Sequence, residues 1–256
     1  MPWRWRPFHG PRPRTVQRCP RDFQVQPFLQ LCLSTVIMGV AFVVAEKFPH
    51  KGYWSAGRWF FGGVTLLALA EMISAAVALV GGTMGVVNPT VMRSPWRARS
   101  VGEFWATRWN TLVAEHCYRR WCFAPFARSN AIAGLFATFI CSGFCHALLA
   151  YVWLGSWPLS LEFGLFFVVQ PFFILLERWL GERRWQPALR WVWTLGILAI
   201  TCPLLVEPFL QFTELWPFSN LWFAAPTIVF AFVILLAGVI SLVSIVACPR
   251  AAPAPN

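Results

Sequence analysis

The sequence predicts an all-α polytopic membrane protein: a helix bundle of about six transmembrane helices plus one interfacial amphipathic helix. Composition is the first observation, because 58% of the 256 residues are hydrophobic and only 12% are charged, whereas a soluble domain carries about 25% charged residues. The second is a series of apolar runs long enough to span a bilayer. The third is that basic residues gather between those runs. Lipid must therefore solvate most of the apolar side chains.

The apolar runs define the expected spans, since a helix needs about 20 mostly apolar residues to cross the hydrocarbon layer. They lie at residues 28–45, 59–80, 131–154, 159–176, 191–206 and 222–247. Pro171 falls inside the fourth run and is expected to kink it, because proline lacks the backbone N–H. The fifth run is short, and we expect its helix either to tilt less than the others or to end at Pro203.

Charge predicts the orientation of the chain. Most of the 21 basic residues fall in the N-terminal tail and in the 81–130 and 177–190 connections. The positive-inside rule then places these segments and both termini in the cytoplasm. Residues 1–26 are expected to be a disordered basic tail, 27–248 the membrane-embedded domain, and 249–256 a second disordered tail. We expect the net charge of +11 to meet membrane lipids and not nucleic acid.

The eight cysteines do not predict a metal site or a disulfide framework. They form no CxxC pair, and no Cys/His cluster has zinc spacing. Cys141 and Cys145 are one helical turn apart inside a span and are expected to be small packing residues. No metal or bound cofactor is therefore expected.

A polar and aromatic stretch precedes the third span. Ser100 and Glu103 have the spacing of a capping box, in which the hydroxyl accepts from a free amide and the carboxylate reaches back. Residues after it recur at helical spacing: Phe104, Trp105, Arg108, Trp109, Leu112, Val113 and His116. We expect one amphipathic helix that ends before Pro125, with its aromatic face in the membrane interface.

Ionisable residues inside the spans are candidates for function, because a charge in hydrocarbon is costly. Glu71 lies within the second span and His146 within the third. Glu71 is either functional or a hydrogen-bonded side chain facing the bundle. His146 is either a packing residue or a base, since burial disfavours its charged form and a neutral imidazole can accept a proton. Glu177 stands at a span end, where we expect it to reach water.

Two blocks of residues resemble a known family. The first runs Pro89-x-x-Met92-x-x-Pro95 and then Ser100-x-x-Glu103-Phe104-Trp105-x-x-Arg108-Trp109-Asn110, and the second is Ser142-Gly143-Phe144-Cys145-His146. Their order and spacing over residues 88–152 resemble the membrane-bound O-acyltransferase superfamily, in particular its wax-synthase-like branch. Asn110 stands where sequences of that branch often carry His.

The resemblance implies acyl transfer within the bilayer, from an acyl-CoA co-substrate to the hydroxyl of a lipophilic alcohol, as in wax ester synthesis. It makes His146 and Asn110 the candidate catalytic residues. His146 would take the proton of the hydroxyl, and Asn110 would either donate to the oxyanion or orient a substrate. Arg108, Trp105, Trp109 and Ser142 are the candidate substrate-binding residues. Arg108 would hold phosphates of CoA or lipid headgroups, and for the two tryptophans a packing or interface role is favoured over direct participation.

A different class of function stays open from the sequence alone. A small transporter or a non-catalytic membrane protein could use Glu71 and His146 along a proton or ion path. A degenerate relative of the acyltransferases would keep the motifs without the activity. The sequence leaves open the acceptor alcohol, the acyl chain length and the oligomeric state.

Overall fold

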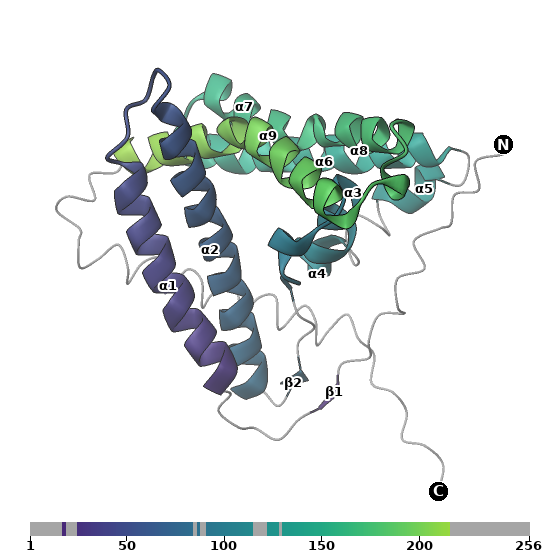
Figure 1. The fold of residues 1–256 in the computed structure, drawn as a ribbon. Helices are drawn as coiled ribbons and strands as arrows, with labels where there is room; N and C mark the ends of the chain where they lie inside the picture. The colour runs from purple at the N-terminus through teal and green to yellow at the C-terminus, as the bar shows by residue number, and fades with distance from the viewer. Residues whose placement is uncertain are drawn as a thin grey trace, which may run out of the picture.

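The computed structural model of the protein describes residues 17–18, 25–83, 86–87, 91–114, 122–127 and 130–215. Helices dominate these ranges (Figure 1). The long ones are α1 (Val25–Ala45), α2 (Ser55–Thr83), α6 (Ala131–Leu154), α7 (Trp157–Val168), α8 (Gln170–Trp179) and α9 (Pro187–Leu215). The short elements are β1 (Gln17–Arg18), β2 (Val86–Val87), η1 (Pro95–Arg97), α3 (Val101–Glu103), η2 (Phe104–Arg108), α4 (Thr111–Val113), α5 (Ala124–Ala127) and η4 (Glu182–Arg184).

Within the described residues, five helical stretches are long and apolar enough to cross a membrane. They are α1, α2, α6, the α7–α8 pair at Trp157–Trp179, and α9 over Pro187–Gln211. The all-α polytopic fold class is thereby confirmed, and each stretch contains one of the first five expected spans. The sixth expected span, 222–247, lies outside the described residues, as do nearly all residues of the two expected tails. The division of the chain into a tail at 1–26, a membrane domain at 27–248 and a tail at 249–256 therefore remains a prediction.

The two proline predictions have opposite outcomes. The expected kink at Pro171 is confirmed, because α7 ends at Val168 and α8 begins at Gln170 with Pro171 in its first turn. Of the two alternatives for the fifth run, the end at Pro203 is wrong, because α9 continues through Pro203 and Pro208 to Leu215. Val206 and Leu210, which follow Pro203, are fully buried in one apolar cluster with Ala45. Burial of these side chains favours continuing the helix past the lost hydrogen bond.

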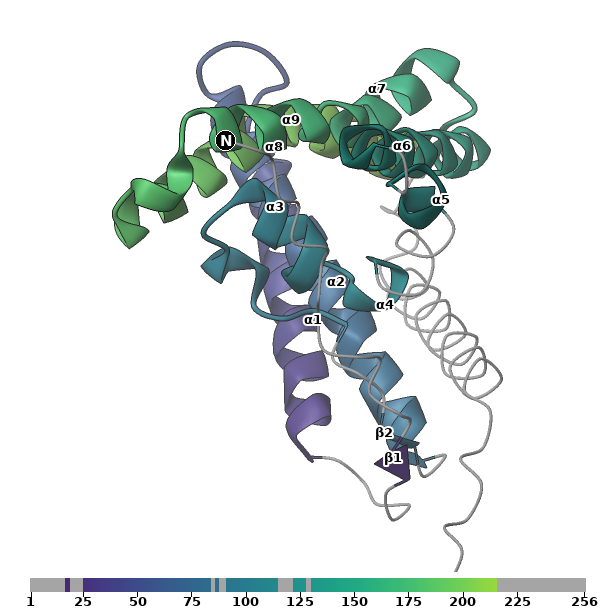
Figure 2. The same cartoon turned by 90° about the vertical axis from the view of Figure 1, so that its right-hand side faces the viewer.

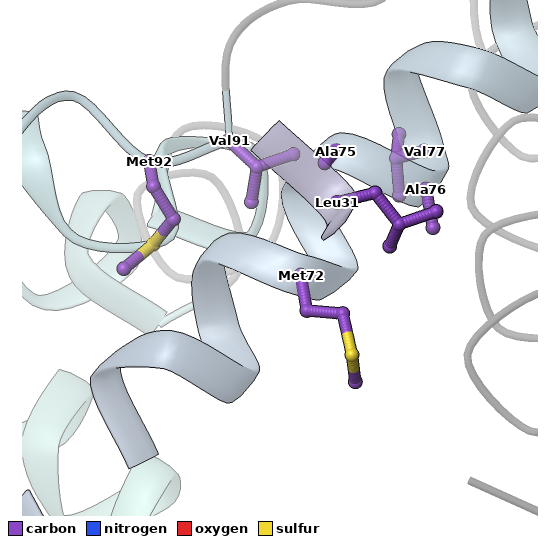
Figure 3. Close-up of a cluster of buried hydrophobic side chains, with 7 residues drawn as sticks. All are labelled: Leu31, Met72, Ala75, Ala76, Val77, Val91 and Met92. Carbon is purple, nitrogen blue, oxygen red and sulfur yellow. The ribbon is translucent and has the colours of Figure 1, made fainter. Parts of the chain in front are cut away.

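The first two helices form a hairpin that extends away from the group made by α6 to α9 (Figures 1 and 2). An apolar cluster of Leu31, Met72, Ala75, Ala76, Val77, Val91 and Met92 fills the space beside it (Figure 3). Two of its members, Val91 and Met92, come from the loop after α2 and not from the hairpin. The cluster therefore attaches that loop to the hairpin.

The hairpin meets α9 through close packing and a buried ion network. A side chain added at Gly62 would collide with Val206 of α9. Arg58, which is fully buried, pairs with Glu46 and Glu207, each at 3.4 Å. A buried guanidinium is stable only when it is paired and hydrogen-bonded. These contacts fix where α9 crosses the hairpin.

The expected amphipathic helix after Ser100 is interrupted, which corrects the sequence interpretation. After one turn of α3 the chain forms the π-helical turn η2, and then Trp109 is extended at φ −92° and ψ 125°. Asn110 follows in the left-handed region at φ 40° and ψ 58°, before the short α4. Residues 115–121 are outside the described ranges, and His116 with them. The break turns the aromatic residues toward protein and not toward an interface, as shown below.

Candidate active site

We call residues 100–110 of the first block the first motif and residues 142–146 the second motif. The first motif begins with the expected capping box. The Glu103 backbone N–H donates to Ser100 Oγ at 2.8 Å. The Glu103 carboxylate reaches back and accepts from the Arg99 N–H at 2.9 Å. Two of the free amides at the start of α3 are thereby satisfied. The prediction is confirmed, with Arg99 and not Ser100 as the donor to the carboxylate.

Glu177 of α8 also binds the start of α3. Its carboxylate oxygens accept from the backbone N–H groups of Val101 at 2.8 Å and Gly102 at 3.0 Å. The side chain is 2% exposed, so the expectation that it reaches water at a span end is wrong. A carboxylate at a helix N-terminus satisfies free donors and interacts favourably with the positive end of the helix dipole. Glu177 therefore joins α8 to the first motif.

The geometry of η2 brings the chain to Asn110. The Trp109 N–H donates to the Phe104 carbonyl at 2.8 Å, which closes the π-helical turn. Asn110 can adopt positive φ because asparagine tolerates the left-handed region better than other residues with a side chain. Its Oδ1 accepts from the Val113 N–H at 3.3 Å and caps α4. This bond directs the amide oxygen toward the backbone and leaves the two Nδ2 hydrogens to donate elsewhere.

The loop at Val91–Met92 holds Asn110 in place from the other side. The Thr111 N–H donates to the Val91 carbonyl at 2.9 Å, and the Asn110 N–H lies 3.4 Å from Met92 Sδ. Val91 and Met92 are both buried in the cluster against α2 (Figure 3). Asn110 is thus attached to the hairpin side of the molecule.

The second motif fixes the tautomer of His146. Its Nδ1 lies 2.7 Å from the Ser142 carbonyl oxygen and 3.4 Å from Ser142 Oγ. A carbonyl oxygen can only accept, so Nδ1 carries the proton. Nε2 is then the unprotonated nitrogen of the neutral ring. It forms no hydrogen bond within the described part of the chain, and its lone pair can accept a proton.

Aromatic stacking and close helix packing hold this imidazole. The ring lies over Phe167 of α7, with centroids 3.9 Å apart and 25° between the planes. Helices α6 and α7 approach each other closely within a turn of His146. A Cβ atom on Gly143 of α6 would lie 2.7 Å from the Gly164 carbonyl oxygen of α7. Glycine at both positions is what allows this contact. The imidazole is therefore held between its own helix and α7.

Trp105 links the first motif to the residues around His146. Its ring meets Phe139 of α6 at 5.8 Å, Phe166 at 5.9 Å and Phe167 at 5.7 Å. Its Nε1–H donates to Gln170 Oε1 at 3.2 Å. The expectation that the aromatic face lies in the membrane interface is wrong for this residue, because the ring packs against α6 and α7.

Trp109 directly follows η2, and its ring lies 6.2 Å from the ring of Trp105. Its ring stacks with Phe104, centroids 5.4 Å apart at 21°, and packs against the cluster of the hairpin. The side chains of η2 therefore fill the space between the hairpin cluster and the residues around His146.

Arg108 makes three contacts within its own region. Its Nε pairs with Glu103 Oε1 at 2.6 Å, and Nη1 donates to the carbonyls of Arg93 at 3.1 Å and Ser94 at 3.3 Å. Ser94 has positive φ, 48°. The guanidinium thus holds a strained turn against η2, and any role toward phosphate remains a prediction.

The structure brings some of the candidate residues together and leaves others apart. Ser142 contacts His146 directly, and Trp105 reaches it through Phe167. Among the described residues, no hydrogen bond or ring contact joins Asn110 to His146. Sequence reasoning overlooked Phe167 and Gln170. A glutamine inside an apolar run beside Pro171 was the available signal, because a polar amide in a span needs partners.

Comparison with known proteins supports the importance of this region. The profile of the Membrane bound O-acyl transferase family matches residues 88–169, which include both motifs. Three proteins of Arabidopsis thaliana are similar. "Probable long-chain-alcohol O-fatty-acyltransferase 2" is 34% identical over 146 residues, covering 54% of this chain and 42% of that protein. "Probable long-chain-alcohol O-fatty-acyltransferase 7" is 29% identical over 209 residues, covering 74% and 61% respectively.

"Probable long-chain-alcohol O-fatty-acyltransferase 6" is also 29% identical, over 213 residues, covering 77% of this chain and 61% of that protein. The chain therefore spans about half the length of the curated relatives it matches. No solved structure gives a significant match. The apolar helices of the chain and the family match together indicate an integral, multi-pass membrane protein. The resemblance to the membrane-bound O-acyltransferase superfamily, in its wax-synthase-like branch, is thereby confirmed over the segment that carries both motifs.

Proposed function

We propose that this protein is an integral membrane O-acyltransferase that moves a fatty acyl group from acyl-CoA to the hydroxyl of a lipophilic alcohol. A long-chain alcohol is the preferred acceptor, because the similar proteins are named for it. The observation that carries the proposal is the state of His146. The bond from Nδ1 to the Ser142 carbonyl leaves Nε2 as an acceptor in an apolar helix, which is what a general base for a hydroxyl requires.

The reaction needs no covalent enzyme intermediate. Nε2 of His146 takes the proton as the alcohol oxygen attacks the thioester carbonyl carbon. The new C–O bond forms the ester, the C–S bond breaks, and the thiolate of CoA receives the proton from the imidazolium. The imidazolium can form because its Nδ1–H stays bonded to the Ser142 carbonyl. His146 is therefore neutral again at the end of each cycle, and the products are the ester and the free thiol of CoA.

Asn110 is proposed to stabilise the oxyanion formed at the thioester carbonyl. Its Oδ1 is occupied by the Val113 N–H, so Nδ2 is the group left to bind a ligand, and Nδ2 can only donate. A donor aimed at developing negative charge is the feature that acyl transfer needs. Its positive φ is consistent with a residue held for function.

Acyl-CoA, with its charged nucleotide, is proposed to enter from the cytoplasm, and the alcohol from the lipid. This assignment rests on the basic residues of the N-terminal tail and of the 81–130 connection. Both termini would then be cytoplasmic. Single cysteines in the tail and in the 46–54 loop, labelled by an impermeant maleimide in sealed vesicles, test it; labelling of both from the same side would refute the orientation.

Ester formation in membranes that contain the protein tests the activity. Labelled acyl-CoA and a panel of lipophilic alcohols are supplied to wild type, His146→Ala and the matched control His50→Ala, at equal protein levels. His50 lies in the loop between α1 and α2, near Glu207, and we expect its variant to keep full activity. His146→Ala should lose at least about 100-fold, the scale of general base catalysis. Product that persists in His146→Ala removes this residue from the mechanism, and folded wild type without product favours a non-catalytic protein.

A further inference from the structure

Gln170 is a polar side chain that is completely buried where α7 meets α8. Its Nε2 donates to the Phe166 carbonyl at 2.9 Å and to Thr201 Oγ1 of α9 at 3.3 Å. Its Oε1 accepts from Trp105 Nε1 at 3.2 Å. One amide thus binds α7, α9 and the first motif together. A buried amide with this set of partners has a single favourable orientation.

A continuous series of contacts leads from this amide to the imidazole. Trp105 is held through its indole N–H by Gln170, and its ring contacts Phe167. Phe167 stacks on His146 at 3.9 Å. Each step joins residues of different elements, so the order of contacts is set by tertiary packing and not by helical neighbours.

Beside a more distant stacking contact with Phe163 at 6.2 Å, two closer contacts restrain the imidazole and with it the position of Nε2. The bond from Nδ1 to the Ser142 carbonyl fixes one edge of the ring. Phe167 covers one face, and Phe167 is itself packed against Trp105. If the indole loses its bond to Gln170, its ring can tilt, and Phe167 can follow. A base must be held within a fraction of an ångström of its productive place.

We propose that Gln170 is a positioning residue that sets the imidazole of His146 through Trp105 and Phe167. The inference rests on the proposed function for its kinetic test. The family profile ends at residue 169, so the match does not extend to Gln170. Gln170 touches no reacting atom in this scheme, and its effect falls on kcat and not on substrate affinity.

Two single variants and their combination test the hydrogen bond. Gln170→Leu removes the acceptor, and Trp105→Phe removes the indole N–H while keeping a ring among the phenylalanines. Trp193→Phe is the matched control, because Trp193 packs on the same apolar cluster and its buried Nε1 has no hydrogen-bond partner in the described structure. Activities are expressed per folded protein, measured by gel filtration and thermal unfolding in detergent.

The expected result is a loss in kcat of roughly ten- to a hundredfold for each single variant, with the KM for acyl-CoA unchanged. The double variant should be no worse than the more impaired single variant, because both remove the same bond. Trp193→Phe should keep wild-type kcat. Unchanged kcat in Gln170→Leu overturns the inference, as do losses that multiply in the double variant or an equal loss in Trp193→Phe. If Gln170→Leu does not fold, the comparison of Trp105→Phe with Trp193→Phe decides between the two outcomes.

A second readout separates this inference from the proposed function. Diethyl pyrocarbonate modifies an unprotonated imidazole nitrogen, and the rate at His146 is followed by mass spectrometry, with His50 as the internal reference. Gln170→Leu and Trp105→Phe should change the His146 rate severalfold and leave the His50 rate alone. If the rate changes but wild type makes no ester, positioning stands and the acyltransferase proposal fails. If wild type makes ester and neither rate nor kcat changes, the positioning role fails.

Discussion

Glu177 in α8 and Glu71 in α2 are both carboxylates within apolar helices, yet their oxygens are satisfied very differently. Glu177 binds two backbone N–H groups of α3, one to each oxygen. Glu71 accepts from Gln30 Nε2 at 2.7 Å through Oε2. Its Oε1 is buried and has no partner among the described residues. Burying an acceptor without a donor costs free energy, so we expect Glu71 to contribute less to stability than Glu177 does.

The difference reflects what each carboxylate joins. Glu177 fixes a short irregular segment that has little packing of its own and carries the first motif. Glu71 and Gln30 join α1 to α2, which already pack along their length in the hairpin (Figure 1). The polar groups around α8 therefore determine the geometry of the candidate site, whereas the polar pair of the hairpin adds little to a contact that apolar packing maintains.

Removing Glu177 should have the largest effect. Glu177→Ala leaves one buried and one part-buried backbone donor without an acceptor, and we expect a loss of about 2–4 kcal/mol in the free energy of unfolding. Glu177→Gln keeps one acceptor oxygen and should lose roughly half as much. Unfolding by denaturant in detergent micelles measures both. Glu182→Ala, at a buried residue of η4 paired with Arg183 at 3.9 Å, is the control; an equal loss there would contradict a special role for Glu177.

Widening the contact between α6 and α7 should have an intermediate effect. Gly143→Ala places a methyl group 2.7 Å from the Gly164 carbonyl, and backbone cannot yield as a side chain would. We expect a loss of about 1–3 kcal/mol in stability, together with lower kcat since Phe167 moves relative to His146. Gly196→Ala in α9 is the matched control, because nothing lies within 4 Å of its added Cβ. It should gain about 0.5–1 kcal/mol. Equal stability of the two variants would refute the close contact.

Removing the polar pair of the hairpin should have the smallest effect. Replacing Gln30 and Glu71 together by Leu removes an unsatisfied oxygen and its partner at once, and stability should stay within about 1 kcal/mol of wild type or rise. Glu71→Leu alone should be less stable than the double variant, because it leaves the Gln30 amide without its acceptor. The proposed acyltransferase activity should be unchanged. Abolished activity in a stable double variant would instead show that Glu71 is an intramembrane functional group.

Part of the candidate site could be predicted because its signals are local. The capping box at Ser100 and Glu103 depends on residues three apart, and the contact of His146 with Ser142 on residues four apart. Helix geometry brings such residues together wherever the helix lies. The break at Asn110 could not be predicted, because the aromatic spacing fits one helix and the competing bonds come from Val91 and Met92.

Polar contacts between residues far apart in the sequence could not be predicted either. Arg58 precedes the second apolar run and resembles a charge of the connection, yet it lies inside α2 and pairs with Glu207, 149 residues away. Glu177 binds Val101 across 76 residues and Trp105 binds Gln170 across 65. A charge or an amide in a sequence does not reveal its partner when the partner is this distant.

The sequence by itself determined where the chain is apolar enough to cross a membrane, where α7 and α8 separate, and which residues form the two motifs. These properties follow from composition, proline chemistry and helical spacing, all of which act over a few residues. Only the tertiary structure decided that α9 continues past Pro203, that Trp105 faces Phe167, and that Glu177 and Gln170 hold the first motif. The physical reason is that buried polar groups and apolar side chains find their partners on other helices, and those pairings exist only once the helices have packed.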